Sequence, residues 1–361
     1  MTLAATVLIP THDHGPTLLR SVRSATAQTV EDVEILVVGD GVPDVTREVM
    51  AELCAEDERI RFVDNPKGPR HGEIHRHAAL QGARGEIVCY LSDDDLWLPD
   101  HVEELRGLLE GHDFAHTLPL SFSAEGEVSV FPGDLEPDDW RQRLFAGQNW
   151  IPLSNGGHSL ELYRRCEGWR TTPPGIPTDL YMWQQLLAAP GCRGVSGVRP
   201  TALHFPSLLR GGWSSERRLA ELDHWADRAA DPRLHAALDA LGREHKRLDG
   251  EARALGSELE HLRRLVGDLD RELQQRDRTI ASLAAELGVI AASVTWRLRR
   301  RLLGVPGLRS AAKALARRAA RPAAEPSRPA PTPGPTPPAT GSPGQDLPSD
   351  SQARPPDPST R

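Results

Sequence analysis

The sequence has few cysteines and no clustered ones. Four occur in 361 residues, at Cys54, Cys89, Cys166 and Cys192, and none forms a CxxC pair with another. Close pairs of cysteines are the signature of zinc sites and of small disulfide frameworks. The spacing indicates neither of these, and a reducing compartment suits four isolated thiols best.

Long hydrophobic runs are also missing. The N-terminal segment MTLAATVLIPTHDHG has no basic region ahead of a sustained apolar one, and the longest later apolar run lies near 287–294. A membrane-spanning helix needs ~20 apolar residues, and a secretory leader needs a basic start. We therefore expect a cytoplasmic protein that does not cross a membrane.

Acidic residues are absent from one part of an otherwise acidic chain. The formal net charge is -8, yet residues 295–321 contain no acid. That stretch holds Arg297, Arg299, Arg300, Arg301, Arg309, Lys313, Arg317, Arg318 and Arg321. A basic segment on an acidic protein indicates a local anionic partner. We expect peripheral contact with the inner face of an anionic membrane and no nucleic acid, the alternatives being a solvated helix or one that binds a protein.

Four apolar runs alternate with helical patterns in the first 110 residues. The runs are TVLIP (6–10), VEILVVG (33–39), RIRFVDN (59–65) and EIVCYLS (86–92), and the helical patterns follow at 16–28, 44–56, 72–83 and 99–110. Nearly continuous apolar runs are typical of strands covered on both faces. The order predicts an α/β fold of βαβ units around a mostly parallel sheet. Further on, we expect strands at 158–163 and 194–198 and a helix at 178–189, as the second half of one domain spanning residues 1–225.

Hydrophobic residues recur every seven positions between 238 and 292. One set is His245, Ala252, Leu259, Val266, Leu273, Ile280 and Leu287; the other is Leu248, Leu255, Leu262, Leu269, Arg276, Leu283 and Ile290. Charged residues between the two sets are typical of a coiled coil, so we expect this helix to pair with a second copy of the chain. Residues 293–321 predict a basic amphipathic helix, and the Pro-rich segment 322–361 predicts a disordered tail.

The segment YLSDDDLWLPD, residues 90–100, places three aspartates together at the end of a predicted buried strand. Neighbouring carboxylates disfavour one another's ionised form unless a cation shares the site. We expect Pro99 to open the next helix, which puts Asp93, Asp94 and Asp95 at the carboxyl edge of the sheet, where open α/β sheets bind ligands. The plainer interpretation is an acidic turn that caps the helix.

Residues 5 to about 220 resemble the family 2 nucleotide-sugar glycosyltransferases, which have the GT-A fold. The matching stretches, in order, are VLIPTHDHGPTLLRSVRSATAQTVEDVEILVVGDG, GPRHGEIHRHAALQGARGEIVCYLSDDDLWLPDHVEEL and TDLYMWQQLL. The resemblance implies a catalytic domain that moves a sugar from a nucleotide diphosphate sugar to a hydroxyl acceptor, with inversion. A glycan or lipid-linked acceptor in cell-surface glycan synthesis is the acceptor class we expect.

The resemblance also implies a divalent metal, Mn²⁺ or Mg²⁺. The family's acidic DxD motif commonly reads LDxDDxWxP, and Ser92 stands here in place of its first acid. By position, Asp93 would contact the ribose, and Asp94 would bind the metal with support from Asp95. Hard carboxylate oxygens suit such a cation, which neutralises charge on the leaving diphosphate. His204 matches a late histidine that completes the metal shell in some members, although a packed core histidine would explain it as well.

Three other positions match nucleotide-contacting parts of the family: Thr11 in PTHD, Asp40 in VVGDG and Arg70 in GPRHGE. Gly39 replaces a second acid that the family usually has beside Asp40, so the base is not implied. The stretch LLRGGWSSERR, residues 208–218, resembles a mobile loop that closes over a diphosphate, or an ordinary surface loop.

Inverting transfer needs a general base that takes the acceptor's proton. Asp179 lies where the family carries its "ED" pair, with Thr178 replacing the glutamate, although Thr-Asp before an apolar helix is also a normal N-terminal cap. For the acceptor we consider Trp150, Asn155 and His158, since aromatic rings suit sugar faces and polar groups suit hydroxyls.

Two other functions compete with the transferase. The departures Gly39, Ser92 and Thr178 favour a degenerate GT-A-fold scaffold that acts through its coiled coil, whereas the retained Asp94 and Asp179 favour the enzyme. A phospho-accepting receiver domain would also carry aspartates at strand ends. Such a domain would end before the second half of the α/β pattern found here.

Overall fold

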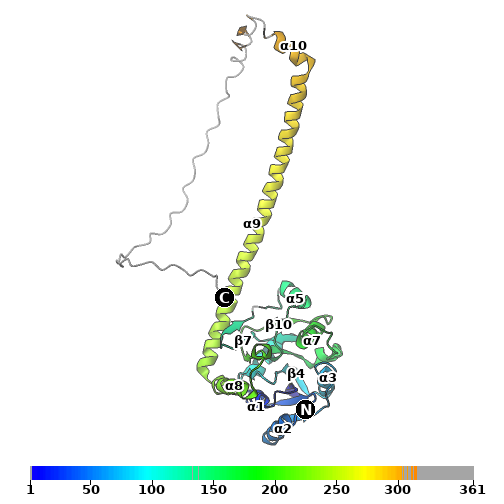
Figure 1. The fold of residues 1–361 in the computed structure, drawn as a ribbon, viewed down its shortest axis with the longest axis vertical. Helices are drawn as coiled ribbons and strands as arrows, with labels where there is room; N and C mark the ends of the chain where they lie inside the picture. The colour runs from blue at the N-terminus through cyan, green and yellow to red at the C-terminus, as the bar shows by residue number, and fades with distance from the viewer. Residues whose placement is uncertain are drawn as a thin grey trace, which may run out of the picture. The chain divides into compact units, whose positions relative to one another are not determined.

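The computed structural model describes residues 2–131, 133–136, 138–302, 304, 307, 310, 311, 313 and 314 (Figure 1). The chain divides into two compact units, Met1–Leu265 and Val266–Arg361, and one long helix passes from the first into the second. The strands are β1 (Leu3–Thr11), β2 (Val33–Gly39), β3 (Ile60–Val63), β4 (Gly85–Tyr90), β5 (Leu96–Trp97), β6 (Phe114–His116), β7 (Leu120–Phe122), β8 (Val128–Val130), β9 (Gly156–Ser159), β10 (Gly194–Ser196) and β11 (Ala202–His204). The helices are α1 (Gly15–Thr26), α2 (Asp44–Glu56), α3 (Glu73–Gln81), α4 (His101–Leu109), α5 (Asp138–Phe145), η1 (Leu153–Asn155), α6 (Leu160–Arg165), α7 (Thr178–Leu187), η2 (Ser207–Arg210), α8 (Ser215–Ala229), α9 (Pro232–Ala292) and α10 (Val294–Leu302).

The main sheet of the first unit is mostly parallel, as the sequence predicted. Its strand order is β10-β6-β9-β4-β1-β2-β3. β1 pairs in parallel with both of its neighbours, with Leu8 beside Leu36 of β2 and beside Tyr90 of β4. Only β9 runs antiparallel to the strands beside it. The parallel strands β1, β2 and β4 therefore end at one common edge.

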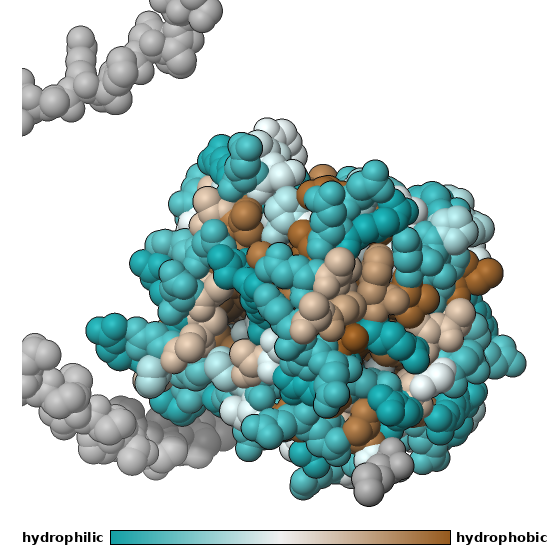
Figure 2. All heavy atoms as spheres, turned by 90° about the horizontal axis from the view of Figure 1, so that it is seen from below, coloured by the Kyte–Doolittle hydropathy of each residue, from teal (hydrophilic) through white to brown (hydrophobic). Residues whose placement is uncertain are grey.

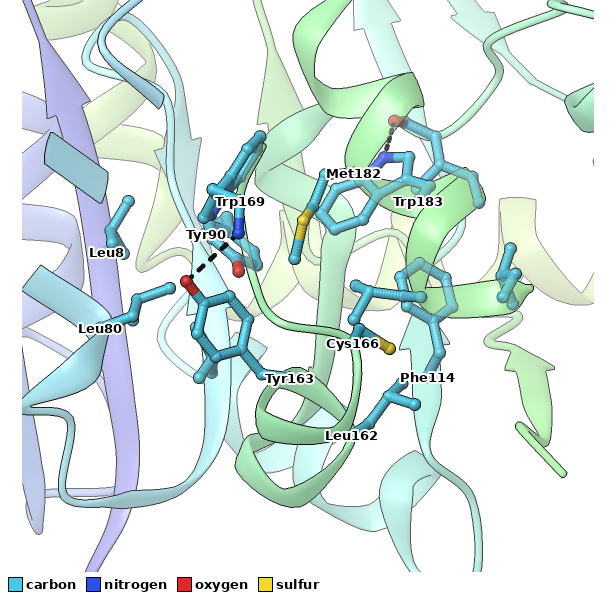
Figure 3. Packing of buried hydrophobic residues seen from close by; sticks show 14 of the residues in the cluster. Leu8, Leu80, Tyr90, Phe114, Leu162, Tyr163, Cys166, Trp169, Met182 and Trp183 are labelled. Atoms are coloured by element: carbon cyan, nitrogen blue, oxygen red, sulfur yellow. Dashed lines mark hydrogen bonds between the residues drawn. The ribbon is translucent and has the colours of Figure 1, made fainter. Parts of the chain in front are cut away.

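Helices cover both faces of this sheet, which explains the nearly continuous apolar runs. Successive residues of a strand point to opposite faces. Val7 and Ile9 accordingly pack with α1, α2 and α4, whereas Leu8 packs with α3, α6 and α7. On the second face Tyr90 meets Trp183 edge-on, with ring centroids 5.5 Å apart (Figure 3).

A second sheet, in the order β5-β11-β7-β8, lies beside the acidic segment. Its apolar residues pack with Leu222 of α8 and Leu238 of α9, so the packed part of the first unit extends past residue 225, the boundary expected from sequence. Gly242 shows how closely α9 approaches this unit. A Cβ atom there would lie 2.0 Å from the carbonyl oxygen of Val198, a contact that only glycine avoids.

The structure corrects two local predictions. The strand expected at 158–163 ends at Ser159, and helix α6 begins there because the Ser159 hydroxyl accepts a hydrogen bond from the Leu162 N–H at 3.1 Å. Pro99 does not open α4, whose N-cap is Asp100. The Pro99 carbonyl instead accepts a hydrogen bond from the Thr29 N–H at 2.7 Å, which ties this segment to the end of α1.

Helix α9 is a single continuous helix across the predicted heptads. Leu255, Val266 and Leu273, which belong to the two heptad sets, are 66%, 66% and 59% exposed. A coiled coil partner for these residues stays a prediction. Among the described residues no single helix is both long enough and apolar enough to cross a membrane, and α9 and α10, bent by 61° at the break between them, meet that test only as a pair.

The surface of the molecule is shown in Figure 2 from one side. On the face shown in Figure 2, hydrophilic side chains dominate and hydrophobic ones occur in small groups between them. Most of the basic helix expected beyond Leu302, and the disordered tail expected at 322–361, lie outside the described residues.

Candidate functional site

A cavity of about 310 Å³ lies at the common carboxyl edge of β1, β2 and β4. Its lining includes Pro10, Thr11, His12, Asp13, His14, Val38, Asp40, Lys67, His71, Gly72, Arg76, Ser92, Asp93, Asp94, Leu153 and Ser207. Parallel strands place the residues that follow them side by side, and this edge therefore gathers acids and bases from segments far apart in sequence. Thr11, Asp40, Asp93 and Asp94 of the sequence-predicted site all line it.

The three adjacent aspartates face different surroundings. Asp93 and Asp94 line the cavity, whereas Asp95 is fully buried behind it. Burial, and after it the neighbouring carboxylates of Asp95 and Asp93, raises the pKa of Asp94 to about 7. The Ser207 hydroxyl on η2 donates a hydrogen bond to Asp94. None of these three carboxylates caps α4, whose N-cap is Asp100. The acidic segment is therefore not the helix-capping turn that the sequence offered as an alternative.

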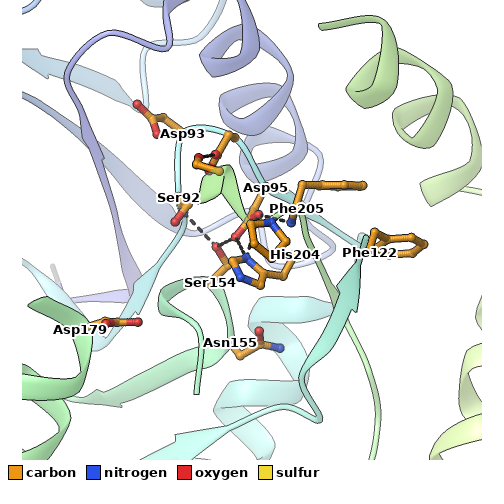
Figure 4. A network of polar contacts seen from close by, with 12 residues as sticks. Ser92, Asp93, Asp95, Phe122, Ser154, Asn155, Asp179, His204 and Phe205 are labelled. Carbon is orange, nitrogen blue, oxygen red and sulfur yellow. Dashed lines mark hydrogen bonds and ion pairs between the residues drawn. The ribbon is translucent and has the colours of Figure 1, made fainter. Parts of the chain in front are cut away.

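Asp95 joins the two sheets. One of its oxygens accepts the Phe205 N–H at 2.8 Å, and the other accepts the Ser154 hydroxyl at 2.5 Å. The His204 Nδ1 lies 3.0 Å from the same carboxylate. Figure 4 shows Asp95 enclosed by these groups, with Asp93 pointing away from them. Asp95 and His204 are thus brought together as predicted, but in a network behind the cavity.

His14 completes the acidic side of the cavity, and the sequence reasoning missed it. Its Nδ1 lies 2.9 Å from an Asp93 oxygen, and its Nε2 lies 3.1 Å from a guanidinium nitrogen of Arg218 on α8. The hydrogen bond with Asp93 raises the pKa of His14 to about 9. The contact with Arg218 decides the protonation of the ring in this geometry, because a guanidinium can only donate and Nε2 must therefore accept, which requires the neutral form. We therefore assign Nδ1 as the protonated nitrogen.

Asp40, directly after β2, forms another wall of the cavity. It accepts the Gly68 N–H at 2.6 Å and pairs with the Lys67 ammonium. Burial acts to raise the pKa of Asp40, but these two partners outweigh it and lower the pKa. Gly72 closes the wall at a positive φ of 75°, where a Cβ atom would lie 2.7 Å from the Asp40 carboxyl carbon.

Arg76 on α3 is a second residue that the sequence reasoning missed. It lines the cavity, donates to the His71 carbonyl at 2.9 Å and lies over the Trp169 ring, 5.1 Å from its centroid. Burial lowers its pKa, and the charges of Glu73, Asp179, Asp40 and Asp93 counteract this. A rule that searched the helix after each strand for basic residues would have found Arg76, and His14 follows β1 in the same way.

Asp179 lies at the start of α7 but does not cap it. The N-cap is Pro177, and the Asp179 carboxylate accepts the Asn149 amide at 2.9 Å and the Leu180 N–H at 2.8 Å. Burial raises the pKa of Asp179, and these two hydrogen bonds oppose it. Asp179 is therefore not the N-cap residue, although its carboxylate accepts one of the free N–H groups of the first turn of α7. Asp179 stands apart from the Asp95 network in Figure 4.

Besides Asp95, Asp179 and His204, four more predicted residues do not line the cavity. Asn155 and His158 are fully buried, where the Asn155 amide donates to the Thr117 hydroxyl and His158 Nε2 lies 2.7 Å from the Tyr90 hydroxyl. Trp150 is also buried, and it packs against His116. Arg70 is exposed, and its guanidinium donates to the Pro173 carbonyl at 3.4 Å. An acceptor role for the three buried residues is wrong in this structure, because the core covers them.

The predicted mobile loop at 208–218 is largely ordered into η2 and α8. Arg210 is only 2% exposed and forms an ion pair with Glu221 of α8. The guanidinium groups of Arg210 and Arg217 both lie over the Trp213 ring, 5.5 Å and 3.6 Å from its centroid. The glycines and basic residues that suggested a loop therefore form a packed corner beside the cavity.

The residues at the cavity fit a divalent cation. Oxygen ligands are what Mg²⁺ and Mn²⁺ prefer, and Asp93 and Asp94 present two carboxylates side by side. The raised pKa of Asp94 reports its burial and, after that, the crowding of negative charge beside it. A cation would relieve that crowding, and Lys67 and Arg76 line the same cavity, where phosphate oxygens could reach them.

Comparison with known proteins points to one family. Residues 6–160 match the model of glycosyl transferase family 2. The chain is 35% identical over 99 residues to the succinoglycan biosynthesis protein ExoW of Rhizobium meliloti, covering 27% of this chain and 31% of that protein. It is 32% identical over 89 residues to a GalNAc(5)-diNAcBac-PP-undecaprenol beta-1,3-glucosyltransferase of Campylobacter jejuni, covering 25% of this chain and 29% of that one. The chain thus spans about a third of the length of these relatives.

Among solved structures, S. aureus TarS 1–349 in complex with UDP-GlcNAc is similar. The TM-score is 0.46 at 15% identity, over 63% of this chain and 68% of that one.

Proposed function

Residues 6–160 form a domain of glycosyl transferase family 2, and from that premise we propose that the protein transfers a sugar from a nucleoside diphosphate sugar to a hydroxyl acceptor. The observation that carries the proposal is the cavity itself. The carboxylates of Asp93 and Asp94 and the basic groups of Lys67 and Arg76 line a single space at the carboxyl edge of the sheet. That is the charge distribution a metal diphosphate needs.

Each group has a role that its surroundings support. Asp93 and Asp94 would hold Mn²⁺ or Mg²⁺, which when bound neutralises charge on the leaving diphosphate. Arg76 has guanidinium N–H groups available for phosphate oxygens, a geometry suited to that group. Asp40, held in place by Lys67 and Gly68, would accept hydrogen bonds from the nucleoside.

We assign the general base to Asp179. Burial raises the pKa of its carboxyl group, which makes the carboxylate a better proton acceptor than an exposed aspartate. A base on the enzyme that activates the acceptor hydroxyl leads to inversion at the anomeric carbon, and inversion is therefore part of the proposal.

The acceptor class follows from the relatives. One is a succinoglycan biosynthesis protein and another acts on an undecaprenol-linked saccharide, by their names. We propose that this protein also works in surface polysaccharide synthesis, on a glycan or lipid-linked acceptor, in the cytoplasm at the inner membrane face. The exposed side chains of α10 support this location, since Trp296 and Leu298 accompany a cluster of arginines that suits an anionic surface.

The test of the transferase is nucleotide binding. Calorimetric titration with UDP, GDP and dTDP, with and without Mn²⁺, should show one nucleotide that binds only with metal. Asp94→Ala should abolish that binding, and Asp139→Ala, an exposed acid outside the cavity, should leave it unchanged. If no nucleotide binds the wild type, the proposal fails and the scaffold acting through α9 is favoured instead.

We further propose that α9 pairs with a second copy. Apart from half-buried His245, the heptad residues are exposed, and Arg276 among them forms an ion pair with Glu272 at 2.9 Å. Light scattering should give a dimer that Leu269→Asp with Leu283→Asp converts to a monomer. Val289→Asp changes an equally exposed residue outside the heptad sets and should remain dimeric; a monomeric wild type would reject the pairing.

The membrane contact has its own test. Full-length protein should bind vesicles containing anionic lipid and lose that binding at high salt, because surface charge attraction is screened. Arg297→Gln with Arg300→Gln should weaken it. Equal binding to neutral vesicles would reject the proposal.

A further inference from the structure

We propose that His14 is a nitrogen ligand of the divalent cation, together with Asp93 and Asp94. The inference rests on the proposed function and adds a ligand that comes from a different segment of the chain. One ligand atom from each of these three residues lies within 4.8 Å of the other two. A cation placed among them would be bound by one imidazole and two carboxylates.

Asp95 and His204, the other two candidate metal ligands expected from the sequence, are not available for this role. Asp95 is fully buried and its two oxygens already accept hydrogen bonds from Ser154 and Phe205 and contact His204. Turning Asp95 toward the cavity would break all of these contacts. His204 itself uses Nδ1 toward Asp95, and it does not line the cavity. The groups that do face the cavity are Asp93, Asp94 and His14.

The ring of His14 is already oriented toward the carboxylates. Asp93 holds Nδ1 at 2.9 Å, and Arg218 on α8 holds Nε2 at 3.1 Å. A ligand that is fixed by its neighbours before the cation arrives loses little conformational entropy on binding. On binding, the neutral ring changes tautomer: Nδ1 releases its proton to solvent and turns its lone pair from Asp93 to the cation, while Nε2 takes up a proton from solvent. Arg218 then gives up its contact with Nε2 and keeps its hydrogen bond to the Arg210 carbonyl at 3.1 Å.

A neighbouring hydroxyl gives an independent sign that this corner receives a ligand. Thr11 lines the same cavity, is 4% exposed, and its hydroxyl has no hydrogen-bond partner among the described residues. The register of β1 and β4, in which Leu8 lies beside Tyr90, carries Thr11 to the level of Asp93. A buried hydroxyl without a partner is unfavourable. A phosphate oxygen, or a water bound to the cation, would supply that partner.

The donor set has a consequence for metal choice. Carboxylates and water suit Mg²⁺ and Mn²⁺ alike, whereas an imidazole favours Mn²⁺ and later transition metals over Mg²⁺. With His14 as a ligand the protein should bind Mn²⁺ more tightly than Mg²⁺. His14→Gln should weaken Mn²⁺ binding at least about tenfold and change Mg²⁺ binding much less.

The direct test is pulsed electron paramagnetic resonance on the Mn²⁺ complex of the full-length protein, with the cognate nucleoside diphosphate present. Wild type should show coupling of the manganese to a directly bound ¹⁴N nucleus. His14→Gln and His14→Asn, whose amide can still donate to Asp93, should lose that coupling. His12→Gln changes the other histidine of the PTHDH segment, which contacts the Asp40 carbonyl, and should keep it.

A parallel variant, His204→Gln, separates the two histidines. Coupling that survives in His14→Gln but disappears in His204→Gln would overturn the inference and assign the nitrogen ligand to His204. Absence of ¹⁴N coupling in the wild type would also overturn it, whatever the folding of the variants. In both cases a nucleotide that binds with Mn²⁺ leaves the proposed function standing, whereas failure of the wild type to bind any nucleotide would reject that function first.

Discussion

Replacing a candidate metal ligand should stabilise the metal-free protein at alkaline pH. In the folded chain burial and the two adjacent carboxylates raise the pKa of Asp94 to about 7, compared with ~3.9 in an unfolded chain. A carboxyl group with a higher pKa in the folded state binds more protons there. Its contribution to stability is therefore complete below pH ~4 and is lost progressively as the pH rises toward 7.

The size of this effect follows from the shift. A change of about 3 pKa units corresponds to ~4 kcal/mol at ~1.36 kcal/mol per unit. Asp93 and Asp95 share the crowding with Asp94, so the full value belongs to the group of three, and removing one charge should recover ~2–4 kcal/mol. The amide introduced by Asp94→Asn would have nearly the same shape as the carboxylate and could still accept the Ser207 hydroxyl, so packing should change little.

Urea unfolding in buffer with a chelator measures the effect. The free energy of unfolding of Asp94→Asn minus that of wild type should have about a third of its full size at pH 5 and should rise to ~2–4 kcal/mol in favour of the variant at pH 8. Asp139→Asn, at an exposed site, should track wild type throughout. Adding Mn²⁺ should stabilise wild type and not the variant. A difference that stays constant from pH 5 to 8 would show that Asp94 is already ionised and paired, and would refute the reasoning.

Three further predictions concern packing. Gly242→Ala should destabilise the packing of α9 on the first unit, because its Cβ atom would lie 2.0 Å from the Val198 carbonyl oxygen. Limited proteolysis should then cut the chain faster near residue 242. The control Gly250→Ala, where no atom lies within 4 Å, should instead gain ~0.5–1 kcal/mol of helix stability. Glu221→Gln should lower the free energy of unfolding by ~3–5 kcal/mol, because Arg210 would keep a buried charge without its partner, whereas Glu216→Gln at an exposed site of the same helix should change it little. A thiol reagent should modify exposed Cys54 in the native protein, whereas Cys89, whose pKa is raised by burial, should react only on unfolding. Thermal and chemical melts, and thiol counts with and without denaturant, check these outcomes.

Much of the fold could be predicted because, in the first half of the chain, short stretches of sequence are enough to identify the strands and helices. Continuous apolar runs gave β1, β2 and β4, and the helix expected at 44–56 coincides with α2. The strand expected at 158–163 failed because Leu160 and Leu162 alternate with polar residues, a strand-like pattern, while Ser159 caps a short helix. Alternation over so few residues does not separate the two structures.

The candidate site was predictable where residues directly follow a strand. Thr11, Asp40, Asp93 and Asp94 fall in that class, and all line the cavity. Asn155 and His158 were chosen for their chemistry alone, and the core buries them. His14 and Arg218 lie 204 residues apart, and no local pattern of the sequence relates them. Such long-range pairs depend on how α8 packs against α1.

The Asp95 network has a consequence for protein engineering. Its carboxylate, contributed from the segment after β4, binds groups on η1 and at the end of β11, so three stretches of chain must be exchanged together in any chimera with a relative. A crossover placed between residues 95 and 154, or between 154 and 204, would combine partners that had not been selected with one another. Breakpoints before residue 90 or after residue 205 keep the network within one parent. A library built on those breakpoints should yield more folded recombinants than one cut at evenly spaced positions.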